Sequence, residues 1–352
     1  MIYLKSQLSS ALDQGGKEAI MTALQQAIEL EHATLPLYLY ALYSLDASKN
    51  PDIVKIVQSV AIEEMLHLTL AANVLNAIGG SPSLDRPDFI PKYPGPLPGG
   101  VDEGTHYHLS PFTRPQLEAF LDIEYPEHPI DFGPNVPVPI PGPVPPPATS
   151  KDDTPITIGQ FYDHIIAQLE TLPDSDFDAS GRNQIGPDQM DNCVVVTDRA
   201  SAIQALKVII DQGEGTSTTA WEVVGTDLAH YYRYLQIWEG KKLEPAPGQP
   251  PPYTFSGAPI VLDPTSVYPV PRDPDASTYT PAQVIANNTF NYTYTNLLKS
   301  LHDTLNGQPE QLDTAIGLMM SLKQLAKGMM SGGADGNTFT GPTFEYQPTL
   351  LS

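Results

Sequence analysis

The sequence contains little cysteine, little positive charge and no long apolar run. Its 352 residues include one cysteine, Cys193, which excludes both a framework of disulfide bonds and a zinc site made of several cysteines. Lysine and arginine number 18, against 41 aspartates and glutamates, so the formal net charge is −23. Because nucleic acids and anionic membranes would repel such a chain, we expect neither of them as a partner.

The apolar segments are too short for a membrane protein. None reaches the ~18 residues that a membrane-spanning helix needs, and the N-terminal residues lack the apolar core of a signal peptide. Hydrophobic residues nevertheless make up 41% of the sequence, which is enough for a sizeable core. These features indicate a soluble protein, and we expect it to be cytoplasmic.

Proline, in contrast, is abundant and unevenly distributed. Ten prolines lie within residues 126–147 and ten more within residues 245–274. Because proline has no amide hydrogen to donate in a helix or a sheet, both stretches are predicted to be loops. The glycine-rich tail from Ser331 is expected to be loosely held.

The remaining sequence is mostly helical in pattern. Apolar residues recur every three or four positions, and Thr157 with Gln160 and Thr280 with Gln283 are capping signals that mark helix starts. Only two segments resemble short strands, 194–196 and 260–262. The predicted helices cover residues 17–45, 51–79, 114–124, 158–169, 198–212, 219–238, 281–306 and 309–330.

These elements predict an all-α fold built on a four-helix bundle. Helices 17–45 and 51–79 would form one pair and helices 198–212 and 219–238 the other, with the last two helices packed outside as a hairpin. The predicted organisation is a bundle over 1–240 with a proline-rich insertion at about 82–150, a proline-rich linker over 241–280, and a C-terminal helical hairpin with its tail over 281–352.

Three ionisable residues interrupt apolar stripes on the first two helices. Glu64 and His67 are three residues apart, so a helix places them on one face, and that face is otherwise apolar. Glu31 interrupts the stripe of the preceding helix in the same way. Burying such groups is costly unless they are paired. An inward Glu followed by an inward Glu-x-x-His is half of a carboxylate-bridged di-metal site, and the alternative is a buried, metal-free Glu–His pair.

Neighbouring residues of the same types are predicted to face solvent. Glu63 falls in line with polar residues of its helix. Glu29 and His32 match the Glu-x-x-His pattern by letter, but they also lie on a polar face. The position on the apolar stripe, and not the motif alone, therefore selects Glu64 and His67.

The second half of such a site has weaker signals. The predicted helix 219–238 carries Asp227 and His230, an Asp-x-x-His version of the motif, on its apolar stripe. Glu214 lies between two glycines at the end of the preceding helix, where it is either a metal ligand or a solvated turn residue. Tyr38 and Tyr234 share stripes with the candidate ligands, so they line a cavity, carry a radical or pack in the core.

Longer strings of residues point to a known family. The segments 27–36 (AIELEHATLP), 61–67 (AIEEMLH) and 73–80 (NVLNAIGG) resemble the ferritin-like domain of iminophenyl-pyruvate dimer synthases, the imine-coupling enzymes of violacein- and rebeccamycin-type bisindole pathways. The resemblance spans roughly residues 18–240, about two thirds of the chain. Further matches lie at residues 123–126, 157–162, 212–215 and 230–234.

The resemblance implies a ferritin-like bundle and a metalloprotein that reacts with dioxygen or peroxide. By position it implies the ligands Glu31, Glu64, His67, Glu214 and His230. It also adds Glu124 as a second-tier candidate ligand, the rank that Asp227 has from the motif spacing. The synthases are linked to haem, but this sequence has no Cys-x-x-Cys-His motif, and they are far longer multidomain proteins.

Three functions remain open on the sequence. The first is an oxidoreductase with a di-iron or mixed Fe/Mn centre, bridged by Glu64, that acts on an amino-acid-derived or aromatic small molecule. The second is a metal-binding or peroxide-detoxifying protein, and the third a metal-free structural module. An apolar cavity beside the site would favour the first and a small, closed site the second. A homo-oligomer is compatible with all three.

Overall fold

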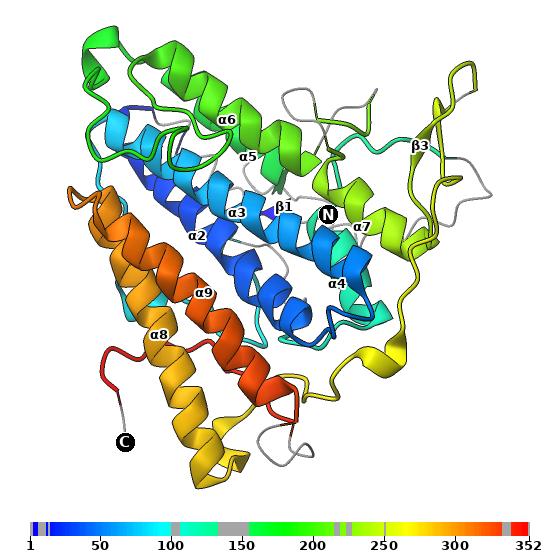
Figure 1. Ribbon diagram of the computed structural model, residues 1–352. Helices are drawn as coiled ribbons and strands as arrows, with labels where there is room; N and C mark the ends of the chain where they lie inside the picture. Colours follow the sequence, from blue (N-terminus) through cyan, green and yellow to red (C-terminus); the bar gives the residue numbers. More distant parts are fainter. Residues whose placement is uncertain are drawn as a thin grey trace.

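The computed structural model confirms an all-α fold (Figure 1). It describes residues 3–5, 12, 15–99, 106–132, 155–214, 219–222, 227–249, 251–332 and 339–350. The helices are α2 (Lys17–Tyr43), α3 (Pro51–Ala77), α4 (Arg114–Ile123), α5 (Ile158–Leu169), α6 (Arg199–Glu214), α7 (His230–Glu239), α8 (Pro281–Leu305) and α9 (Gln311–Met330). Short 3-10 helices cover Pro87–Phe89, Asp174–Asp176, Pro264–Ser266 and Ala276–Thr278.

The strands are two residues long and lie away from the predicted positions. β1 (Tyr3–Leu4) pairs with β2 (Ile156–Thr157), and β3 (Glu244–Pro245) pairs with β4 (Tyr253–Thr254), both antiparallel. The prediction of strands at 194–196 and 260–262 is wrong, because neither segment has a strand partner among the described residues.

Local signals start the helices as predicted. Thr157 and Thr280 form complete capping boxes with the glutamines three residues on. Pro51 opens α3, but the Asn50 side chain does not cap it. The Asn50 Oδ1 atom accepts from the backbone of Asp263 at 2.8 Å instead, and it thereby ties the proline-rich linker to the bundle.

The bundle consists of two unbroken helices and two interrupted ones. α2 and α3 pack side by side over their full length (Figure 1). α4 and then α5 run antiparallel to α2, since Tyr38 contacts Glu124 at the end of α4. Farther back along α2, Glu31 contacts Tyr162 in α5. α4 and α5 therefore occupy the position of one bundle helix.

α6 and α7 occupy the fourth position in the same way. Both run antiparallel to α3, with Gln212 of α6 beside His67. His230, the first residue of α7, lies beside Glu63 of α3. α4 pairs with α7 and α5 with α6, so both interruptions lie at the level of the Glu31, Glu64 and His67 side chains.

The prediction of one helix over 219–238 is therefore wrong, and so is the pairing built on it. Residues 219–222 and 227–229 are not helical, and Trp221 forms an isolated β-bridge with Leu228. The helix starts only at His230. The second layer of the bundle consists of α4, α5, α6 and α7 together.

The C-terminal hairpin packs on the outside as predicted. α8 and α9 lie side by side and contact α2 and α3 (Figure 1). The expectation of a loosely held tail is wrong for residues 339–350, since Phe344 is buried and packs on Phe290 of α8. The side chain of Asn291 in α8 accepts from the backbone of Glu345 at 3.1 Å.

The structure bears on two further expectations. Among the described helices, none is long and apolar enough to cross a membrane.

The first proline-rich stretch falls mostly on residues 133–154, which lie outside the described residues. The second stretch is described except for residue 250, and it follows the surface as turns and the β3–β4 hairpin. The proposed division into a bundle, a linker and a hairpin region stays a prediction.

Candidate metal centre

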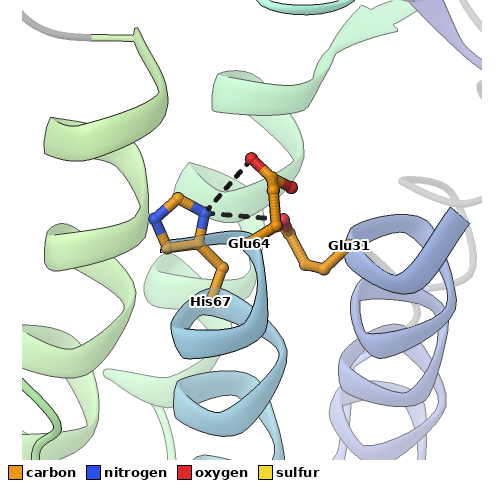
Figure 2. A group of neighbouring side chains, drawn as sticks. All are labelled: Glu31, Glu64 and His67. Atoms are coloured by element: carbon orange, nitrogen blue, oxygen red, sulfur yellow. Dashed lines mark ion pairs between the residues drawn. The ribbon is translucent and has the colours of Figure 1, made fainter. Parts of the chain in front are cut away.

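Five buried side chains from four helices of the bundle form one cluster. Glu31 comes from α2, and Glu64 and His67 come from α3, where their three-residue spacing puts them on one face (Figure 2). Glu124 is the residue that ends α4, and His230 is the first residue of α7. The helix interruptions therefore supply two of the five groups.

The five side chains form two groups that share one carboxylate. In the first group, His67 Nδ1 lies 3.5 Å from Glu31 Oε2 and 4.0 Å from Glu64 Oε1 (Figure 2). In the second, His230 Nδ1 lies 3.0 Å from Glu64 Oε1 and 3.4 Å from Glu124 Oε2. The candidate ligand atoms of each group lie within 4.8 Å of one another. Glu64 is therefore common to two sets of candidate ligands, one with His67 and Glu31 and the other with His230 and Glu124.

Both imidazoles turn the same nitrogen toward the carboxylates. The Nε2 atom of His67 lies 3.1 Å from the Gln212 amide oxygen, and that of His230 lies 3.0 Å from Glu63. Since both partners accept, Nε2 carries the hydrogen and Nδ1 faces the cluster. The buried His230 Nδ1 has no partner of hydrogen-bond geometry in the described part of the chain. An orphaned nitrogen facing carboxylates fits an Fe or Mn ion.

Electrostatics inside the cluster also favour a bound cation. Burial, followed by the nearby charge of Glu124, raises the pKa of Glu64 to about 7. Burial alone would lower the pKa of His67 and of His230, but their carboxylate neighbours outweigh it and raise both. The same contact with His67 outweighs burial at Glu31 and lowers the pKa of that carboxyl. Without a metal, protons must therefore supply the positive charge that three buried carboxylates require.

Hydroxyl groups fix the carboxylates from outside. The Tyr162 hydroxyl donates to Glu31, and the Tyr38 hydroxyl donates to Glu124. The Thr34 hydroxyl donates to Glu64 Oε2 at 2.9 Å. Each carboxylate therefore has one oxygen occupied by a donor and another free for the interior, as outer partners of metal ligands commonly arrange.

A small cavity of about 60 Å³ lies against the cluster. The helix interruptions open it, because Glu124, the helix start at Thr157 and Gly159, and Gly213 near the end of α6 all line it. Its other lining is mostly aliphatic and includes Leu30, Ile158, Ile209 and Ile210. Neither Tyr38 nor Tyr234 is among the lining residues, so both pack in the surrounding core, with ring centroids 5.7 Å apart.

Of the sequence-predicted residues, Asp227 does not join the group. The Asp227 side chain is 62% exposed and lies 3.9 Å from Arg233, because the segment before His230 is not helical. Glu214 ends α6, but its side chain lies outside the described residues, so its role as a ligand stays a prediction. Glu124, which only the family resemblance implied, lies beside His230.

The expectation that Glu63 and His32 face solvent is wrong. The Glu63 side chain is only 19% exposed, because α7 covers this face of α3 and pairs it with Arg233. His32 is buried against α8, where Nε2 lies 2.6 Å from the Tyr294 hydroxyl. Glu29 is half-buried and pairs with Arg86.

Sequence reasoning also missed Arg233 and Gln212. Arg233 lies in a segment of aromatic and aliphatic residues, HYYRYLQIW, and a charge in that setting requires a buried acidic partner. A buried ion pair of Arg233 could therefore have been predicted from the sequence, but its partners, Glu63 and Glu222, could not. Gln212 carries no local signal of its own.

The fold and the site define a four-helix-bundle protein with a buried centre of carboxylates and histidines. A family model described as Ferritin-like matches residues 24–239, and the chain belongs to this family. The narrower resemblance to iminophenyl-pyruvate dimer synthases is not confirmed.

A solved structure supports the same fold. The chain is similar to a ferritin-like protein from Caulobacter vibrioides, with 23% sequence identity and a TM-score of 0.57. The match covers 93% of this chain and 97% of that one, so it includes the C-terminal hairpin region. No curated protein matches the chain.

Proposed function

We propose that this protein is an oxidoreductase with a carboxylate-bridged pair of Fe or Mn ions that reacts with dioxygen or peroxide. The observation that supports this best is the sharing of Glu64 between two groups of ligands. His67 and Glu31 would hold one ion, and His230 and Glu124 the other. When bound, such a pair supplies Lewis-acid and redox chemistry.

The cavity limits which molecules reach the centre. Its volume of about 60 Å³ accommodates a few water-sized molecules. That suits dioxygen or hydrogen peroxide, and it is far below the ~300 Å³ at which pockets for larger ligands begin. The aliphatic lining around Leu30 and Ile158 keeps bulk water away from the cluster.

Residues of this chain fix the orientation of the carboxylates and keep hydrogen-bond donors beside them. Thr34, Tyr38 and Tyr162 hold one oxygen of each carboxylate, so the other oxygens point inward. Burial and neighbouring carboxylates raise the pKa of both phenols well above their usual value, so each remains a hydrogen-bond donor at neutral pH. His67, His230 and Glu64 would hold the metal ions in their deprotonated forms and would release protons on binding them.

The small cavity favours a second candidate, a metal-dependent peroxide-consuming protein without an organic substrate. An amino-acid-derived or aromatic substrate rests on the family resemblance alone. The two candidates differ in one measurable respect. Under the first, an aromatic amino acid or its imine is oxidised as peroxide or dioxygen is consumed. Under the second, consumption is independent of any organic compound.

Metal content tests the proposal directly. We expect about two Fe or Mn ions per chain by plasma mass spectrometry after anaerobic loading, with an oxygen electrode reporting consumption. Glu64→Ala should abolish binding at both positions, since both groups use this carboxylate. Asp227→Ala is the matched control, because that exposed carboxylate lies apart from the cluster.

Two outcomes would contradict the proposal. A wild-type protein that binds no metal after anaerobic Fe(II) loading would make the cluster a buried polar network, in which Glu31 and His67 pair with each other. Unchanged metal content in the Glu64→Ala variant would remove the shared carboxylate from the site.

A further inference from the structure

The two imidazoles of the centre are held in different ways. The Nε2 atom of His67 donates to the amide oxygen of Gln212 at 3.1 Å. The Nε2 atom of His230 donates to the carboxylate of Glu63 at 3.0 Å. Both partners fix the ring so that Nδ1 faces the cluster, but only Glu63 brings a negative charge.

Arg233 keeps that charge in place. Its Nη1 and Nη2 atoms donate to the two oxygens of Glu63 at 2.9 and 2.8 Å, which is a bidentate pair. The Arg233 side chain is 1% exposed and also donates to the buried Glu222. Since arginine stays charged even when buried, Glu63 remains ionised and fixed beside His230.

An ionised partner makes an imidazole a stronger metal ligand than a neutral partner does. The negative charge of Glu63 stabilises the positive charge that develops on the His230 ring when Nδ1 binds a cation. Partners of this kind typically change metal affinity by about 10–100-fold. The His230 half of the centre therefore has the stronger nitrogen ligand.

The cavity adds a second difference between the halves. Glu31, His67 and Glu124 line it. His230 is fully buried and is not among its lining residues in the described structure. The cavity therefore contacts carboxylates of both halves but only the His67 imidazole.

We propose that the two halves are inequivalent: the His230–Glu124 half, whose imidazole is held by the ionised Glu63, takes up metal first and tightly, and the His67–Glu31 half, whose imidazole lines the cavity, takes up the second, exchangeable ion. This inference rests on the proposed two-metal function and adds an order of loading to it. Glu63 and Arg233 are positioning residues, since they act through His230 and do not face the cavity.

Titration of the metal-free, full-length protein with Mn(II) tests the order. Electron paramagnetic resonance counts free Mn(II) and distinguishes isolated ions from coupled ones. We expect two steps, of which the tight one survives in His67→Ala and is lost in His230→Ala. Glu63→Gln should weaken the tight step by about 10–100-fold and leave the weak step in place. Glu29→Gln is the matched control, because Glu29 pairs with Arg86 outside the centre.

Each result decides a separate point. Two steps of equal affinity, or a tight step that survives in His230→Ala, would overturn the order of loading. A Glu63→Gln titration identical to that of the wild type would overturn the positioning role. The two alanine variants decide the order even if Glu63→Gln fails to fold, which thermal unfolding of the metal-free variant would reveal. A wild-type protein that binds no Mn(II) would instead refute the two-metal function.

Discussion

Acid should lower the free energy of unfolding, because His32 is buried where the C-terminal hairpin packs on the bundle. The pKa of His32 gives the size of this loss. His32 is 1% exposed, and its ring stacks on Phe89 at a centroid distance of 4.4 Å. Its Nε2 atom meets the Tyr294 hydroxyl of α8. Burial lowers the pKa of His32 from 6.5 to about 3. The unfolded chain therefore takes up a proton between these values, and the folded chain does not.

The direction and size of the effect follow from linkage. Because the pKa of His32 is lower in the folded state, its contribution to stability is present above pH 6.5 and is lost as the pH falls toward 3. Between pH 7 and pH 4, this difference in proton uptake reduces the free energy of unfolding by about 3 kcal/mol. The other titrating groups change with pH as well, so a variant is needed to isolate this term.

His32→Gln provides that comparison, because glutamine can still hydrogen-bond to Tyr294 but does not titrate. Urea unfolding of both metal-free proteins at pH 7 and pH 4 gives the difference in their stabilities. We expect the wild type to lose about 3 kcal/mol relative to the variant on acidification. A difference in stability that is the same at both pH values would refute the assignment of a depressed pKa to His32.

Two further predictions concern buried tyrosines. Tyr162→Phe should destabilise the metal-free protein by about 1–3 kcal/mol, because it removes the hydrogen-bond donor from the buried Glu31. Tyr234→Phe should be nearly neutral, since the buried Tyr234 hydroxyl has no partner among the described residues. Thermal unfolding of both variants checks this difference, and equal losses of stability would contradict it. Gly341→Ala should cost about 1–3 kcal/mol, because a Cβ there would overlap the ring of Tyr40. Urea unfolding should show a smaller cost of Gly341→Ala when it is made in a Tyr40→Ala background, and an equal cost in both backgrounds would count against the overlap.

Much of the first half of the site could be predicted from local sequence. The helices α2 and α3 are continuous over 27 residues each, so a period of 3.6 residues places Glu31, Glu64 and His67 reliably on inward faces. The second half could not be predicted in this way. The predicted stripe through Asp227 and His230 assumed one continuous helix, but α7 starts at His230 and Asp227 stays exposed.

The sequence by itself determined the helical class, the helix starts at Thr157 and Thr280, and three inward-facing ligand candidates, because each depends on contacts between residues at most four apart. Only the tertiary structure decided that Glu124 and His230 complete the cluster, since they come from helix interruptions brought together across the bundle. It also decided that Glu63 and His32 are buried. Periodicity identifies which face of a helix is apolar, but a polar face is covered or exposed according to which distant element packs on it, here α7 over Glu63 and α8 over His32.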